Sequence, residues 1–224
     1  MNTPVTRIRW GGTGVTVDTP TGTLRTKACI ITVSTGVLAA GNIVFDPPLP
    51  SWKLDAINDV PMGLLAKIAL KFQGTRFDLT DNAWLTYLVE ETMPAEACFF
   101  LCWPFGEDLM IGFVGGSFGY ELSRAGASTA IDFGLEELRK LFGSEVDKHF
   151  VKGHFTDWAT NPLTLGGYAA AKPGRTAARK QIATPLAERL FFAGEAVAGP
   201  YVATCGGAYM SGRDTAMSVA HLIG

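Results

Sequence analysis

The end of the sequence carries the residues best suited to chemistry, arranged as a strand, a turn and a helix. Residues 190–193 form an apolar run of strand length, Gly194 and Glu195 follow as a turn, and 207–223 is predicted to be helical. The first turn of such a helix has unpaired N–H groups and about half a positive charge. Small residues near Gly206 let a ligand approach the backbone. The pattern suits a bound group that gains negative charge, and an ordinary strand–helix turn with packing glycines explains it as well.

A second pattern is typical of a different chemistry. Residues 115–119, Gly-Gly-Ser-Phe-Gly, satisfy G-x-S-x-G after an apolar strand. In a hydrolase that geometry exposes a nucleophilic serine. A glycine-rich turn explains the pattern equally well in a chain with 26 glycines. A serine hydrolase using Ser117 is therefore an alternative hypothesis, and its partners would come from Asp132, His154, Asp157 and His221.

Bulk composition limits the classes of function. The chain has 224 residues, of which 47% are hydrophobic, enough to bury a substantial core. Its formal net charge of −2 leaves no basic surplus for nucleic acid or an anionic membrane. Apolar runs are strand-sized, short of the ~20 residues that a membrane span needs. Its three histidines form no zinc motif. Its four cysteines contain no C-x-x-C pair, and no signal-peptide pattern opens the chain. We therefore expect a cytoplasmic protein with reduced thiols.

Hydrophobic periodicity predicts a mixture of strands and helices. Residues 5–10 and 15–17 alternate, and 24–33 changes to a continuous apolar run, which predicts a β-meander feeding a buried strand of a parallel sheet. Helices are predicted over 52–60 and over 128–142, the latter capped by Gly143. Further strands are predicted at 66–72, 83–89, 98–103 and 109–114. The outer segments thus form an α/β unit and the middle an inserted α+β unit.

The terminal motifs resemble those of a known family. Phe192-Ala193-Gly194-Glu195-Ala196, followed by Ala203-Thr204-Cys205-Gly206-Gly207-Ala208-Tyr209-Met210-Ser211-Gly212, is similar to the closing flavin-binding motif of the flavin-containing amine oxidases. That family includes polyamine oxidases, monoamine oxidases and lysine-specific histone demethylases. Three upstream segments resemble the family's motifs in the family's order: 32–38, 45–50 and 158–168.

The resemblance covers the family's carboxy-terminal portion and implies its architecture. Residues 1–37 and 187–224 would form part of an FAD-binding Rossmann-like domain. Residues 38–186 would form an inserted mixed-sheet substrate-binding domain. The implied reaction transfers a hydride from the carbon next to an amine to FAD, giving an imine, and oxygen is then reduced to hydrogen peroxide. Which amine is oxidised is left open.

The resemblance also implies roles for individual residues. On periodicity alone, Lys67 belongs to the polar face of a half-buried strand, but its register in 65–72 is similar to the family's x-x-Lys-x-x-x-x-Phe. The resemblance implies that Lys67 lies near flavin N5, beside the start of the last helix. There it would polarise a water and stabilise developing negative charge. The implied cofactor-binding residues are Val5, Thr32, Trp158, Gly194, Glu195, Thr204 and Cys205. The implied substrate pocket contains Leu163, Tyr168 and Thr204.

The sequence also departs from the family pattern. It lacks the G-x-G-x-x-G turn that holds a dinucleotide pyrophosphate. Ser34 replaces a proline, and Leu163 replaces the tryptophan of the demethylase branch. We therefore expect a fragment, a subunit of a split enzyme or a degenerate descendant, unable to hold FAD or turn over alone. An amino-terminal FAD-domain partner or self-association would cover the exposed face. A non-catalytic binding or assembly module is the remaining alternative.

Overall fold

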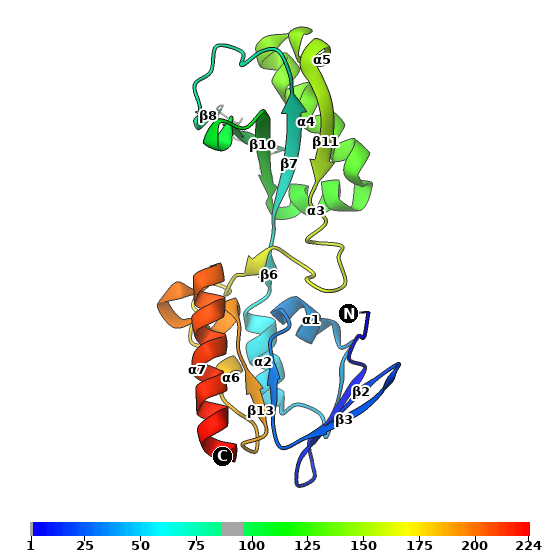
Figure 1. The fold of residues 1–224 in the computed structure, drawn as a ribbon, viewed down its shortest axis with the longest axis vertical. Coiled ribbons are helices and arrows are strands. Elements are labelled where there is room, and N and C mark those ends of the chain that lie inside the picture. The colour runs from blue at the N-terminus through cyan, green and yellow to red at the C-terminus, as the bar shows by residue number, and fades with distance from the viewer. Residues whose placement is uncertain (1, 87–95) are drawn as a thin grey trace. The chain divides into compact units, whose positions relative to one another are not determined.

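The computed structural model describes residues 2–86 and 96–224, which divide into two compact units (Figure 1). Unit 1 comprises Met1–Gly63 and Pro162–Gly224, and unit 2 is Leu64–Asn161. A continuous unit is thus inserted into a discontinuous one. Both boundaries lie inside the segment 38–186, and the assignment of 1–37 and 187–224 to FAD binding stays a prediction.

A four-stranded sheet opens unit 1. It comprises β1 (Arg7–Arg9), β2 (Val15–Thr19), β3 (Gly22–Thr26) and β5 (Val44–Asp46), in the order β3-β2-β1-β5. The first three strands pair antiparallel and β5 pairs parallel to β1. The predicted β-meander is confirmed.

A second sheet of unit 1 joins segments far apart in the sequence. Strand β4 (Cys29–Ile31) pairs in parallel with β13 (Leu190–Phe192). The predicted parallel pairing is confirmed, and the run 24–33 divides between β3 of the meander and β4 of this sheet. The chain leaves the meander after Thr26, whose hydroxyl donates to the Ala28 carbonyl over 3.0 Å, and re-enters another sheet. Hydrophobic periodicity does not detect such a break, because both halves remain apolar.

Helices and a short ribbon complete unit 1. The helices predicted over 52–60 and 207–223 are confirmed, with ends shifted by up to two residues. The helices are α1 (Thr35–Ala40), α2 (Ser51–Asp59), α6 (Ala178–Ala183) and α7 (Cys205–Ile223), with 3₁₀ turns η2 (Glu195–Val197) and η3 (Gly199–Tyr201). Strands β6 (Met62–Gly63) and β12 (Tyr168–Ala169) form the ribbon. Within the described residues, no helix is long and apolar enough to span a bilayer.

A buried lysine ties three elements of unit 1 together. Lys53 on α2 is fully buried, and its ammonium donates to the carbonyls of Gln181, Ile182 and Thr184 at 2.5–2.9 Å. The ammonium also lies 4.2 Å from the ring centroid of Phe192 on β13. A cation at the carboxy end of α6 satisfies its last carbonyls and suits its dipole. Lys53 therefore fixes α6 and β13 against α2.

This lysine should make stability rise with pH. Burial lowers the pKa of Lys53 from 10.5 to about 8. Between these values the unfolded chain binds more protons, so the unfolding free energy rises with pH in that window. The three carbonyls favour the ammonium, so the gain stays below a ceiling of about 3 kcal/mol. Chemical denaturation of Lys53→Met should show this increment lost; equal pH slopes for both proteins would disprove the effect.

Unit 2 is built on one antiparallel sheet. Its strands are β7 (Leu65–Phe72), β8 (Ala83–Leu85), β9 (Phe99–Cys102), β10 (Leu109–Gly115) and β11 (Phe150–Phe155), in the order β11-β7-β10-β9-β8. The predicted strands at 66–72, 98–103 and 109–114 are confirmed, as is the beginning of 83–89. Residues 87–89 of that prediction lie outside the described residues.

Helices cover one face of this sheet. They are α3 (Gly116–Ala125), α4 (Ala127–Phe142) and α5 (Glu145–His149), and η1 (Pro104–Gly106) is a short 3₁₀ turn. The α4 helix and its Gly143 cap are confirmed. Ile68, Leu70 and Phe72 are fully buried in the core between sheet and helices. Every second residue of β7 therefore points the other way, which places Lys67 on the opposite face.

Two cysteines belong to this core. Burial raises the pKa of Cys98 to about 12 and that of Cys102 to about 11. Both therefore remain neutral thiols near pH 7, and neither suits a nucleophile's role.

Candidate functional site

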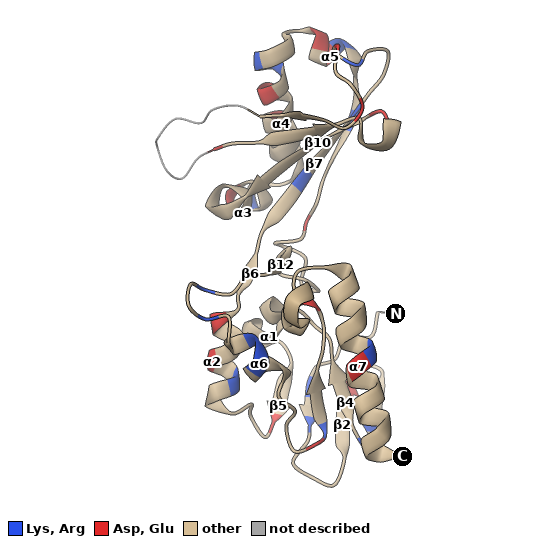
Figure 2. Ribbon diagram, turned by 90° about the vertical axis from the view of Figure 1, so that its left-hand side faces the viewer, with Lys and Arg blue, Asp and Glu red and all other residues tan. Residues whose placement is uncertain are grey.

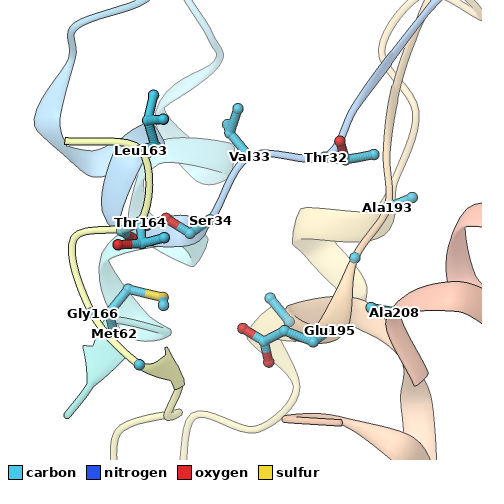
Figure 3. Close-up of a pocket in the computed structure, with 13 residues that line it drawn as sticks. Thr32, Val33, Ser34, Met62, Leu163, Thr164, Gly166, Ala193, Glu195 and Ala208 are labelled. Carbon is cyan, nitrogen blue, oxygen red and sulfur yellow. Dashed lines mark hydrogen bonds between the residues drawn. The ribbon is translucent and has the colours of Figure 1, made fainter. Parts of the chain in front are cut away.

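A pocket of about 370 Å³ opens in unit 1 where five segments converge (Figure 3). Its volume lies within the range of small-molecule sites. The segments are the chain after β4, strand β6, the loop before β12, the turn after β13, and α7. The lining residues are Thr32, Val33, Ser34, Met62, Leu163, Thr164, Gly166, Gly167, Ala193, Gly194, Glu195, Ala196 and Ala208.

Glu195 fixes the turn after β13 with both of its carboxylate oxygens. Oε1 accepts from the N–H of Ala169 over 2.8 Å, and Oε2 accepts from the N–H of Ala203 over 3.1 Å. Gly194 precedes it with φ of 134°, a backbone conformation that favours glycine. The carboxylate therefore positions β12 and the loop before α7 rather than acting as a solvated cap.

Arg179 on α6 reinforces the same junction. Its guanidinium donates to the Ala196 carbonyl over 2.7 Å and to the Ala169 carbonyl over 2.8 Å. Glu195 and Arg179 thus hold the N–H and the carbonyl of one residue, Ala169. Sequence reasoning missed Arg179, because its partners are backbone atoms and leave no pairing signal in the sequence.

Thr204 caps the amino end of α7. Its hydroxyl accepts from the N–H of Gly207 over 2.9 Å and donates to the Tyr201 carbonyl over 2.7 Å. The Thr204 carbonyl takes the N–H of Ala208. The first-turn donors that remain to face a ligand are therefore those of Cys205 and Gly206.

Ser34 joins two walls of the pocket. Its Oγ accepts from the N–H of Val37 over 3.1 Å, which caps α1, and donates to the Thr164 carbonyl over 2.6 Å. A proline at this position makes neither bond. The replacement noted in the sequence is thus accommodated by a link between the α1 segment and the 163–167 loop. Leu163, the other departure, lines the pocket and is 75% exposed.

The predicted site residues are distributed over both units. The pocket brings together Thr32, Gly194 and Glu195 from the predicted cofactor set and Leu163 from the predicted substrate set. Their roles stay predictions. Elsewhere in unit 1, Thr204 and Cys205 begin α7, Tyr168 lies on β12 opposite Gly63, and Val5 packs partly buried against the core.

Lys67 and Trp158 belong to unit 2. Lys67 is half-buried on β7, and its ammonium donates to the Leu65 carbonyl over 3.2 Å. Its backbone N–H donates to Thr156 Oγ1 over 2.9 Å, which fixes the backbone beneath the side chain. Trp158 follows β11 and is 40% exposed.

Ser117 lies exposed in the first turn of α3, directly after β10. Strand β10 runs antiparallel to both β7 and β9. Within the described part of the chain, no hydrogen bond links Ser117 to a histidine, and a hydrolase stays a prediction.

The unit 1 pocket fits a flat ring that gains negative charge. Ala193, Gly194 and Ala208 present walls almost at backbone level. The Glu195 carboxylate, with one N–H bound at each oxygen, keeps the turn rigid, and the N–H groups of Cys205 and Gly206 lie within one turn before Ala208 on α7. Such donors stabilise an anionic ring edge.

Comparison with known proteins identifies the family. The family model of flavin-containing amine oxidoreductases matches residues 1–220. Polyamine oxidase 4 of Oryza sativa subsp. japonica is 35% identical over 219 residues, covering 95% of this chain and 43% of that protein. Lysine-specific histone demethylase 1 homolog 1 of the same subspecies is 34% identical over 224 residues, covering 96% and 26%. The chain therefore spans less than half the length of these relatives.

Solved structures share the fold. Cyclohexylamine oxidase from Brevibacterium oxydans superposes with a TM-score of 0.74 at 23% identity, over 98% of this chain and 48% of that chain. A redesigned putrescine oxidase superposes with a TM-score of 0.75 at 19% identity, over 98% and 49%. The expected fold class, a partial amine oxidase fold, is confirmed. With the family model matching nearly all of its residues, this chain belongs to the flavin-containing amine oxidoreductase family.

Proposed function

We propose that this chain is the carboxy-terminal part of an FAD-dependent amine oxidase. The family match over residues 1–220 carries the proposal, and the pocket around Glu195 supports it. A bound flavin would accept a hydride from the carbon next to the amine and reduce oxygen to hydrogen peroxide. Thr32, Gly194 and Glu195 would hold the ring, and the N–H groups of Cys205 and Gly206 would stabilise its negative edge.

Lys67 would act on the oxygen side of the reaction. An ammonium has three N–H donors, and the described contact with the Leu65 carbonyl uses one of them. The other two can hold a water and place a positive charge beside developing negative charge. Tyr168 and Leu163 would contact the amine substrate.

A completing segment is part of this proposal. Of the 19 residues of α7, only Gly207 and Val219 are buried, and Tyr209 and Met217 are 71% and 56% exposed. Parallel strands are normally covered on both faces within larger sheets. The two-stranded β4–β13 sheet and the bare α7 support docking of an amino-terminal FAD-domain segment.

Among the strands that the structure describes, β4 forms the open edge of this sheet. The outer edge of β13 is occupied at Leu190, which forms a bridge with Leu186. On β4, the Cys29 N–H donates a hydrogen bond to the Arg189 carbonyl, and the Ile31 carbonyl accepts one from the Ala193 N–H. Because alternate residues of a strand direct their backbone groups to opposite edges, the Ile30 N–H faces away from β13.

Replacing Ile30 by proline should block docking of the completing segment. Proline removes the outward N–H and is tolerated on edge strands, so the β4–β13 pairing should survive. The probe is the portion of Polyamine oxidase 4 outside the aligned 219 residues. Co-purification should fall at least tenfold for Ile30→Pro and stay unchanged for Ile30→Val, which keeps the donor. Equal co-purification of both variants would contradict docking at β4. If the chain instead self-associates, light scattering of the chain alone would give a mass above that of the monomer.

Flavin retention tests the proposed function. The chain joined to the completing segment should co-elute with absorbance near 450 nm, lose it anaerobically on adding an amine, and release hydrogen peroxide in air. A folded, completed protein without flavin absorbance would favour the non-catalytic module.

A further inference from the structure

The face of the unit 2 sheet opposite the helices carries three large aromatic side chains. Along β10, Met110, Gly112 and Val114 face the helices, so Ile111 and Phe113 face the other way. The register places Phe113 opposite Phe99 on β9 and opposite Lys67 on β7.

The aromatic side chains form a continuous surface. Phe99 and Phe113 stack with centroids 5.1 Å apart and planes within 6°. The ring of Trp84 on β8 lies 5.9 Å from Phe99 and 5.8 Å from Phe113, tilted by about 30°. Trp84 is 55% exposed and Phe99 is 40% exposed. Large aromatic side chains exposed together mark a binding surface, because their hydration is costly.

The charged side chains on the strands of this sheet, as far as the structure describes them, are all basic. The five strands, as described, contain no aspartate or glutamate (Figure 2 draws β10 in tan and shows blue on β7). Lys67 and Lys71 share the outer face of β7, and the register adds Lys152 and His154 from β11. A ligand with several ammonium groups would meet like charges here, whereas a neutral amine with an apolar body would not.

We propose that Trp84, Phe99 and Phe113 form a specificity wall for the apolar ring of a monoamine, whose amine end lies toward Lys67. This inference rests on the proposed function, because the bound amine is a substrate only if the completed protein oxidises amines. It names monoamines as the substrate class. Aromatic stacking supplies orientation and discrimination. Diamines and longer polyamines are disfavoured, because their second ammonium finds no described carboxylate on the strands.

Binding to the flavin-free chain tests the wall. The probes are benzylamine and 1,5-diaminopentane, followed through the indole N–H signal of Trp84 in ¹⁵N–¹H NMR spectra. Benzylamine should shift that signal, and raising the pH toward the amine's own pKa should tighten binding. Trp84→Ala should weaken benzylamine binding at least fivefold, whereas Trp52→Ala, which removes a 40% exposed tryptophan from unit 1, should not.

The outcomes separate the wall from the proposed function. Absent benzylamine binding, equal binding of the diamine, or equal affinity for the Trp84→Ala variant would overturn the wall. A completed protein that holds flavin but prefers the diamine would overturn the wall alone. Benzylamine binding at Trp84 in a protein that never holds flavin would overturn the proposed function alone.

Discussion

Replacing Lys67 by methionine in the completed, FAD-loaded protein should slow reoxidation by oxygen about 10²–10³-fold, the usual loss when one preorganised donor is removed from developing negative charge. Methionine keeps the length and apolar stem but removes the ammonium. The only side-chain hydrogen bond described for Lys67 is to the Leu65 carbonyl, so its loss should change folding little. Stopped-flow absorbance after anaerobic reduction by an amine measures this step separately from amine oxidation.

Lys71→Met is the matched control. Lys71 lies on the same face of β7, four residues further along and exposed. The same substitution there removes the same charge from the same strand, so reoxidation should stay within about twofold of the parent rate. Equal slowing in both variants would indicate a general effect of charge, and an unchanged rate in Lys67→Met would refute its role.

Gly207→Ala should destabilise unit 1 strongly. A Cβ at Gly207 would lie 2.0 Å from the Tyr201 carbonyl oxygen, a backbone atom, so the loop before α7 must move. Overpacking costs about 1–3 kcal/mol, and a clash with a backbone atom lies toward the upper end of that range. The movement would also disturb the Thr204 cap and the N–H of Ala203, which bonds Glu195. Thermal unfolding by circular dichroism measures the loss.

The neighbouring glycine supplies the control. A Cβ at Gly206 would meet nothing within 4 Å. Gly206→Ala should therefore be neutral or stabilise α7 by up to about 1 kcal/mol, from helix propensity alone. Similar destabilisation of both variants would show that the tight approach at Gly207 does not hold the loop.

Hydrophobic periodicity predicted the elements that bury a regular face. The alternation of β7 and the spacing in α4 were confirmed, because one side of each packs against a core. The break in 24–33 escaped it, since both sides of the break are apolar. Where a strand changes sheets depends on tertiary pairing, which a local pattern does not contain.

The site was less predictable than the fold. The resemblance led to Thr32, Gly194 and Glu195, which the pocket brings together. It did not indicate that Glu195 binds two backbone N–H groups, that Arg179 holds the adjoining carbonyls, or that Ser34 links two walls. All of these contacts involve main-chain atoms, which every residue possesses, so side-chain identity alone cannot reveal them.

The most direct test of this account is the crystal structure of the completed protein with FAD bound. The account predicts the isoalloxazine ring against the turn at Gly194 and Glu195 and beside the first turn of α7. The ammonium of Lys67 should reach a ring nitrogen directly or through one water. A flavin bound away from this turn, or a Lys67 side chain on a surface remote from the ring, would contradict it.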